Sequence, residues 1–171
     1  LVDVGTGQRQ EVSGVPINIR VAGQGGLGDV VAAPDFARSG TIYLSFAEGE
    51  GDLSGAAVGL GRLVLDGGSP RLENFRVIWR QQPKVTGAGH YSHRIAFGPD
   101  GKLYISSGER QKFEPAQDEN GNLGRIVRLN PDGSVPADNP WAARGGVGAQ
   151  AWTMGNRNVL GFAFAPDGKL W

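Results

Sequence analysis

The chain has 171 residues and a mass of 18.0 kDa, the size of one ordinary domain, and 39% of the residues are hydrophobic, enough to form a buried core. It holds 29 glycines and 10 prolines, and this density of turn-forming residues disfavours long helices. Seventeen basic and seventeen acidic residues cancel to a net charge of +0, so we expect no nucleic-acid partner. The absence of cysteine excludes disulfides and thiolate metal sites, and no apolar run is long enough to predict a membrane span.

The two ends of the sequence predict that the chain is part of a longer polypeptide. It begins LVDVGTGQRQ, with neither an initiator methionine nor a secretory leader, and it ends on GKLW, which is the start of a strand. We therefore expect a single domain, residues 1–171, that is truncated at both ends.

One eight-residue pattern occurs twice. Residues 97–104 read FGPDGKLY and residues 164–171 read FAPDGKLW, and a looser copy, APDFARSG, precedes them, so that Pro34, Pro99 and Pro166 are 65 and 67 residues apart. A Pro-Asp-Gly turn between apolar runs predicts a β-hairpin. Further strands are expected at residues 58–65, 75–80, 124–130 and 159–165, which gives about four strands in each period.

Four-stranded units at a fixed period are typical of a β-propeller, an all-β fold in which the units are blades around a central channel. A chain of 171 residues holds about two and a half to three such blades, fewer than the four to eight that close a ring. We therefore expect open blade faces that need further blades or lead to self-association. The same pattern leaves a compact β-sandwich of about ten strands as the alternative.

Two histidines, His90 and His93, stand in the segment GHYSHR, just before the strand expected at residues 95–97. On an extended backbone, positions three apart point to opposite faces, so the pair does not predict a joint metal site. A histidine at the entrance of a strand, in a glycine-rich loop, suits general-base work because its ordinary pKa is near neutrality. The alternative is a hydrogen-bonded surface histidine.

Three further segments are considered as ligand-binding sites. Residues 155–158 place Arg157 beside Asn158 ahead of an apolar run, which suits an anionic ligand, and the alternative is a turn with a surface ion pair. Residues 23–28, GQGGLG, lack the Lys-Ser/Thr of a phosphate loop, and we expect these glycines to let the backbone approach a ligand or a neighbouring blade. Residues 118–122 predict a turn and not a calcium loop, because no glutamate stands at the twelfth position.

Taken in order, these segments resemble the glucose/sorbosone dehydrogenase family, soluble aldose sugar dehydrogenases that use pyrroloquinoline quinone (PQQ). The resemblance covers nearly the whole chain. The elements that carry it are GQGGL followed by DV at residues 29–30, GHY at 89–91 with Arg94, QD at 117–118, LGRIVRLN at 123–130, DGSVPADNP at 132–140 and GNRN at 155–158.

The resemblance implies a six-bladed propeller that oxidises the anomeric hydroxyl of an aldose to a lactone. It implies that His90 is the base that takes the hydroxyl proton while hydride passes to the quinone, and that Gln24, Arg157 and Asn158 contact the cofactor. It further implies calcium with ligands downstream of this chain, an external electron acceptor, and a periplasmic or secreted location. The chain by itself would then be weakly active or inactive.

Three positions depart from the family pattern. Gly89 stands where an acidic or amide residue is usual, His93 stands where glycine is usual, and Val159 replaces the proline of a Pro-Gln-Gly segment. These departures leave open how His90 is oriented, whether His93 crowds the loop or contacts the substrate, and how tightly the quinone binds.

Two other functions are consistent with a propeller. The first is a non-catalytic sugar-binding or interaction propeller, in which the departures have dismantled the site. The second is a lactonase, which would need inward carboxylates that hold a metal. The sequence does not favour it, because Asp29, Glu109 and Asp118 are scattered and lack ligand spacing.

Overall fold

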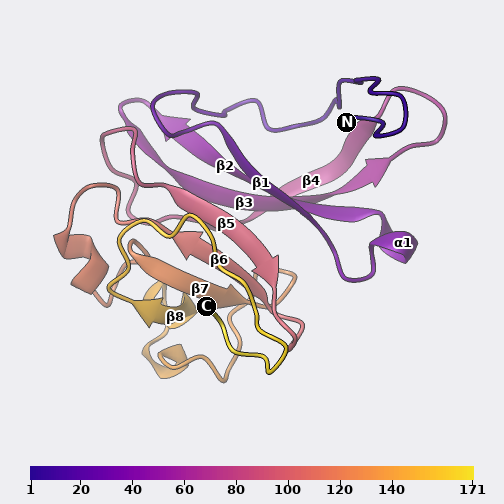
Figure 1. Cartoon of the computed structure of the whole chain (residues 1–171). Coiled ribbons are helices and arrows are strands. Elements are labelled where there is room, and N and C mark those ends of the chain that lie inside the picture. The colour runs from indigo at the N-terminus through magenta and orange to yellow at the C-terminus, as the bar shows by residue number, and fades with distance from the viewer.

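The computed structural model, which describes residues 1–171, contains two antiparallel sheets of four strands each (Figure 1). The first sheet consists of β1 (Leu27–Ala32), β2 (Thr41–Glu50), β3 (Leu53–Val64) and β4 (Arg71–Arg80). The second consists of β5 (Ser92–Phe97), β6 (Leu103–Ser107), β7 (Arg125–Leu129) and β8 (Ala151–Met154). Strands that follow one another in sequence are neighbours in space, and no strand passes between the sheets. This is the order of two successive propeller blades, so the prediction of four strands per repeat is confirmed.

Helices are few and short, as the glycine content predicts. They are α1 (Phe36–Ser39) and three single 3₁₀ turns, η1 (Glu114–Gln117), η2 (Ala142–Arg144) and η3 (Gly148–Gln150). None of them is long and apolar enough to cross a membrane.

The repeated Pro-Asp pattern lies at the same place in both sheets. Pro34 stands in the connection from β1 to β2, and Pro99 stands in the connection from β5 to β6. In the second copy Gly101 takes a positive φ of 71°, which completes the expected hairpin turn. The third copy forms a turn as well, in which Phe164 forms a bridge with Leu170.

The prediction of a strand at residues 159–165 is wrong. Only its last part is paired: Phe164 forms a bridge with Leu170, while Ala163 and Ala165 bond to the backbones of Trp171 and Lys169. A strand needs a partner along its whole length, and residues 169–171 accompany only three residues of this segment. The structure thus holds eight strands in two separate sheets, fewer than the ten or so of the sandwich alternative.

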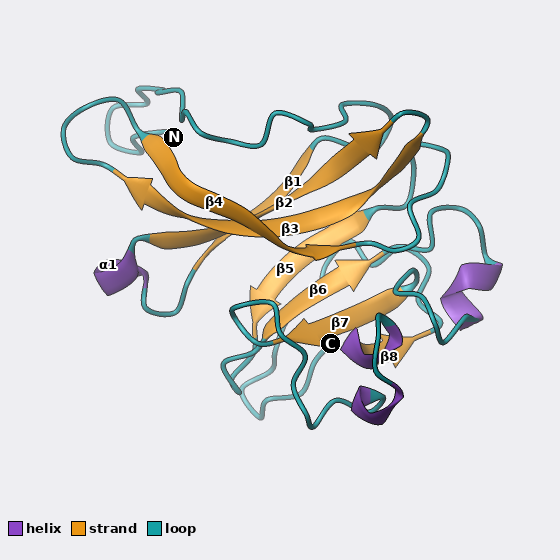
Figure 2. Cartoon of the chain, turned by 180° about the vertical axis from the view of Figure 1, so that it is seen from behind, coloured by secondary structure: helices purple, strands orange, loops and turns teal.

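The hydrophobic core lies between the two sheets, where they cover one another face to face (Figure 2). From the first sheet it receives Tyr43, Val58 and Trp79, which pack toward residues of the second sheet such as Ile95 and Leu103. The strands β1 and β5 lie side by side, which brings the beginnings of the two sheets together. The segments that lead into these two strands carry the predicted site residues.

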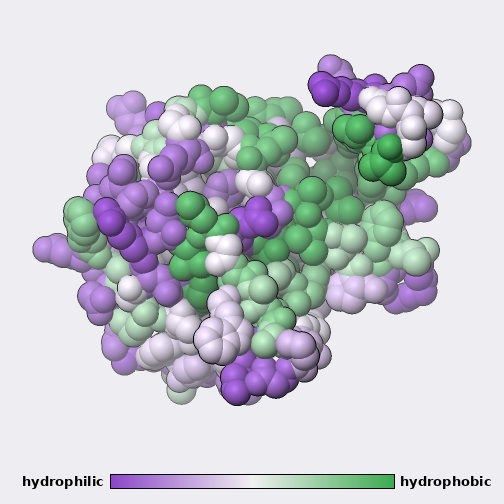
Figure 3. Space-filling model, in the orientation of Figure 1, coloured by the Kyte–Doolittle hydropathy of each residue, from purple (hydrophilic) through white to green (hydrophobic).

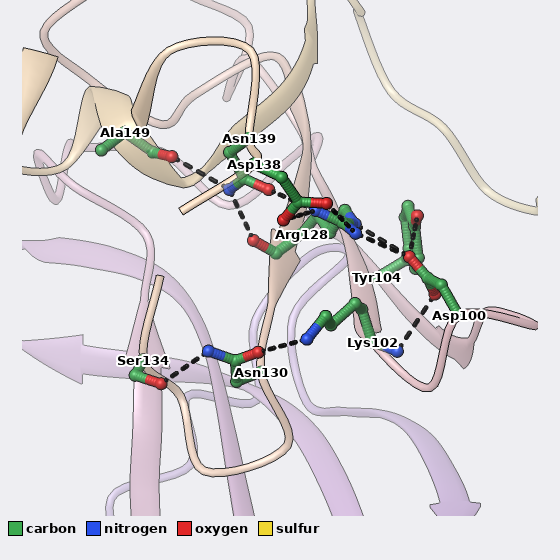
Figure 4. Close-up of polar contacts among 9 residues, drawn as sticks. All are labelled: Asp100, Lys102, Tyr104, Arg128, Asn130, Ser134, Asp138, Asn139 and Ala149. Atoms are coloured by element: carbon green, nitrogen blue, oxygen red, sulfur yellow. Dashed lines mark hydrogen bonds and ion pairs between the residues drawn. The ribbon is translucent and has the colours of Figure 1, made fainter. Parts of the chain in front are cut away.

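One buried arginine ties the long loop after β7 to its sheet (Figure 4). The side chain of Arg128 is only 5% exposed, and it donates to Asp100 at 2.9 Å, to both carboxylate oxygens of Asp138 at 2.9 and 3.0 Å, and to Asn139 at 3.0 Å. Asp100 belongs to the Pro-Asp-Gly turn, and the amide of Asn139 bonds back to the carbonyl oxygens of Arg128 and Ala149. Several residues in the segments LGRIVRLN and DGSVPADNP therefore have a structural task.

Candidate functional site

The histidine segment enters β5 through an irregular backbone. His90, Ser92 and His93 have positive φ angles of 50°, 59° and 51°. The pairing with β6 shifts by one residue, because Ser92 pairs with Ser107 but Ile95 pairs with Ile105, which is a β-bulge. The segment was expected to be extended, and this expectation is wrong. Hydrogen bonds of the loop impose the positive φ angles and the bulge instead. The two imidazoles are still in different surroundings, and no group of three His, Asp or Glu side chains could hold a metal ion.

The imidazole of His90 is paired with the carboxylate of Glu109 through Nδ1. The two side chains are 13% and 2% exposed. Burial by itself would raise the pKa of Glu109, but hydrogen bonds from His90 and from the N–H groups of Phe113 and Gln111 outweigh it and hold that pKa below its usual range. An ionised carboxylate only accepts hydrogen bonds, so Nδ1 carries the proton, and in the neutral imidazole Nε2 is then the proton acceptor.

The glycine-rich segment before β1 holds the other side of the histidine loop. Oε1 of Gln24 accepts the backbone N–H of His90 at 2.7 Å, and the backbone N–H of Gln24 bonds to the carbonyl oxygen of Ala88 at 2.8 Å. A Cβ at Gly23 would lie 2.5 Å from that same oxygen. The expectation that these glycines permit close approach to a neighbouring blade is confirmed at this position.

The predicted residues after β8, Arg157 and Asn158, contact the histidine loop and Glu109. Oδ1 of Asn158 accepts the hydroxyl of Ser92 at 3.0 Å, and the carbonyl oxygen of Arg157 accepts the N–H of Glu109 at 2.9 Å. The guanidinium of Arg157 lies 5.8 Å from the ring centroid of Phe113, is exposed, and has no acidic partner. The structure thus brings all four predicted site residues together, although they are spread over 135 positions of the sequence from Gln24 to Asn158.

A pocket of about 320 Å³ opens beside these residues. Its lining comes from the three repeats: Gln24, Gly28, Tyr91, Ser92, His93, Asn158 and Leu160. Gly28, His93 and Leu160 are 65 and 67 residues apart, the same separations as between the three repeated prolines. Figure 3 shows apolar surface across the middle of the face on which Figure 1 shows β1 and β5. Leu27 and Val30 of β1 are exposed. The pocket therefore lies where equivalent positions of successive repeats converge.

Two residues of the site were not predicted from the sequence as functional. Glu109 appeared only as a scattered carboxylate, yet the β5–β6 hairpin pairs Ser92 with Ser107, and extending that register by two residues brings His90 opposite Glu109. This register exists only beyond the bulge, because the turn end of the hairpin pairs Phe97 with Leu103, so the sequence held no signal for the His90–Glu109 pair.

The second unpredicted residue is Arg110, which is 1% exposed. Its guanidinium stacks 3.7 Å from the ring centroid of Tyr91 and donates to the carbonyl oxygens of Gly87, Gly89 and Ser54. Burial is the main influence and lowers the pKa of Arg110, and the nearby Tyr91 and Glu109 offset it only in part. Arg110 thus holds the loop that carries His90, and it acts as a positioning residue.

The departure at Gly89 has a direct structural counterpart. A Cβ at this position would lie 2.5 Å from Oε1 of Gln111, so the amide of Gln111 fills the space beside the histidine. His90 itself is held by Glu109 at its ring and by Gln24 at its backbone. The orientation that the sequence left open is therefore defined by partners from two other segments.

Comparison with known proteins relates this site to one family. The sequence model of the family described as Glucose / Sorbosone dehydrogenase matches residues 1–171. The chain belongs to the glucose/sorbosone dehydrogenase family. The resemblance found in the motifs is thereby confirmed over the entire chain.

Individual members of this family are similar in sequence and in structure. The aldose sugar dehydrogenase YliI of Escherichia coli (strain K12) is 41% identical over 169 residues, which are 98% of this chain and 45% of that protein. A crystal structure of glucose dehydrogenase superimposes with a TM-score of 0.93 at 44% identity and covers 100% of this chain and 49% of that chain. The PQQ-bound form of an aldose sugar dehydrogenase from Streptomyces coelicolor gives a TM-score of 0.85 at 29% identity, over 99% of this chain and 47% of that chain. The chain spans about half the length of these relatives.

Proposed function

We propose that the full-length protein that contains this chain is a PQQ-dependent aldose dehydrogenase, with His90 as its general base. The observation that carries the proposal is the His90–Glu109 pair, which lies at the same junction of repeats as the unpaired guanidinium of Arg157. The sugar dehydrogenase relatives and the PQQ-bound relative support the same reaction class.

The donor set of the site fits a quinone that carries carboxylates. The amide oxygen of Gln24 is occupied by the N–H of His90, and that of Asn158 by the hydroxyl of Ser92, which leaves both amide nitrogens as donors. The Arg157 guanidinium supplies a planar fork that matches a carboxylate or a carbonyl oxygen. When bound, the quinone would accept the hydride from the sugar.

The chain's own residues account for the proton. Oxidation of an anomeric hydroxyl to a lactone removes a proton from oxygen and a hydride from carbon. Nε2 of His90 would take that proton, and the carboxylate of Glu109 would stabilise the resulting imidazolium while keeping the ring in the productive orientation. Gln24 would fix the backbone of His90 during this transfer.

The proposal extends to features outside residues 1–171. It includes a six-bladed ring completed by further blades, calcium bound by downstream residues, an external electron acceptor, and a periplasmic or secreted location. The chain by itself is then expected to oxidise sugar weakly or not at all, since much of the cofactor contact would be missing.

The test follows the absorbance of PQQ on addition of an aldose, with calcium present, in wild-type full-length protein and in His90→Ala. We expect the variant to bind PQQ but to reduce it about 10² to 10⁴-fold more slowly. Arg38→Ala is the control, because the side chain of Arg38 is 85% exposed on α1. Equal rates in His90→Ala and wild type would refute the assignment of the base. A wild type that binds sugar without reducing PQQ would favour the non-catalytic sugar-binding propeller.

A further inference from the structure

His93 is a buried polar side chain to which the proposed reaction gives no task. It is 5% exposed, and its Nδ1 is fully buried without a hydrogen-bond partner. No protein group bonds to Nε2 either, but Nε2 is not among the fully buried unpaired atoms. Since His93 lines the 320 Å³ pocket, Nε2 is the ring nitrogen that the pocket can reach.

Irregular backbone in both repeats leaves room for the imidazole of His93. Gly28 is the equivalent of His93 one repeat earlier, 65 residues before it. Both lie in β-bulges, one between Leu27 and Val30 in β1 and one between Ser92 and Ile95 in β5. A Cβ at Gly28 would overlap Nδ1 of His93, so the first repeat has no side chain at the position where the second repeat has an imidazole.

The surroundings keep the ring neutral and fixed. The charged groups that act on it are Asp29 on β1, Arg94 on its own strand and Arg110 from the loop after β6. Burial is the largest influence and lowers the pKa of His93 to about 4. The ring of Tyr91 packs at 6.1 Å in an edge-to-face arrangement. A neutral imidazole in a fixed position offers one donor and one acceptor, and a buried polar group without a partner is unfavourable.

We propose that His93 is a ligand-binding residue of this pocket, whose Nε2 hydrogen-bonds to an oxygen atom of the bound ligand. The inference rests on the proposed function, which supplies two sources of such an oxygen: a hydroxyl of the aldose, or a carbonyl or carboxylate oxygen of PQQ. The amides of Gln24 and Asn158 line the same pocket, and each has its nitrogen free for an oxygen of the same ligand. The residue that departs from the family pattern thereby becomes a determinant of affinity or specificity.

The test compares His93→Phe, which keeps a ring but has no nitrogen, with His93→Gln, whose amide nitrogen can replace Nε2. In the full-length protein the Kd of PQQ is measured by absorbance titration without sugar, and KM and kcat are then measured for an aldose. We expect His93→Phe to raise the Kd or the KM about five- to tenfold, and His93→Gln to restore most of the loss. A higher Kd identifies a PQQ oxygen, and a higher KM at unchanged Kd identifies a sugar hydroxyl.

The inference is overturned if His93→Phe matches wild type in both Kd and KM, or if His93→Gln loses as much as His93→Phe. Should His93→Phe fail to fold, the ¹⁵N resonance of Nε2 in wild type, assigned by its loss in His93→Gln, must shift when PQQ or aldose is added. The absence of a shift with either probe overturns the inference. Wild-type protein that binds PQQ without oxidising sugar refutes the proposed function alone, provided that His93→Phe weakens the binding. Wild type that binds neither probe refutes both.

Discussion

The buried imidazole of His93 makes the stability of the fold depend on pH in a defined window. Its pKa is about 4 in the folded protein, against an ordinary value of 6.5, because burial disfavours the charged ring. Between these values the unfolded chain binds the proton more tightly than the folded one, so the free energy of unfolding falls as the pH falls from about 6.5 toward 4. Below about pH 4 both states carry the proton, and this contribution changes no further.

The gap of about 2.5 pH units corresponds to about 3 kcal/mol in total, of which about 2 kcal/mol is lost between pH 7.5 and pH 5. The perturbation is His93→Gln, which removes the titrating group but keeps a polar side chain of similar length. Urea unfolding of both proteins at pH 7.5 and pH 5 measures the effect. We expect wild type to lose about 2 kcal/mol more than the variant over this interval.

All titratable groups other than His93 are present in both proteins, so the difference between the two proteins isolates His93. The buried carboxylates Glu48 and Glu109 have lowered pKa values and stay ionised in the folded protein at pH 5. Equal losses in wild type and variant, or an NMR titration of His93 with a midpoint near its ordinary value, would refute the reasoning.

Three further substitutions test the contacts described above. Glu109→Gln should lower kcat by on the order of 10²-fold with little change in KM, because the amide allows the wrong tautomer of His90; an unchanged kcat in a steady-state dye assay would contradict this. Gly28→Ala should lower the unfolding free energy by about 1–3 kcal/mol, because its Cβ overlaps the ring of His93; a melting temperature equal to that of wild type would show that the ring moves freely. Arg128→Gln should lower the unfolding free energy by about 2 kcal/mol while PQQ affinity is kept, and a loss of affinity without a loss of stability would argue against its structural role.

The parts of the fold that could be predicted are those set by local sequence. The Pro-Asp-Gly turns and the alternation in LYISS placed the hairpins, and the repeat length divided the chain into four-stranded units. The prediction of a strand at residues 159–165 was wrong. An apolar run shows that a segment is able to pair, but it does not show that a partner strand lies beside it.

The sequence pointed to four residues that the fold brings close together, but their conformations were not predicted. The bulge at His93 depends on Asp29, whose carboxylate accepts the N–H of Ile95 at 3.1 Å from 66 residues away. Likewise, the orientation of His90 depends on Glu109 and Gln24, which belong to other segments. Such long-range hydrogen bonds override local backbone preference, and the register of the β5–β6 hairpin changes at the bulge that they impose.

The shared volume at Gly28 and His93 constrains how the family can vary. A side chain at position 28 and an imidazole at position 93 compete for the same space, so neither position is free to change while the other is occupied. Members of the family with a larger residue at the first position should carry a small one at the second. The two positions are equivalent in successive repeats, and both line the same pocket. A side chain that faces the ligand can therefore come from the first repeat or from the second, but not from both.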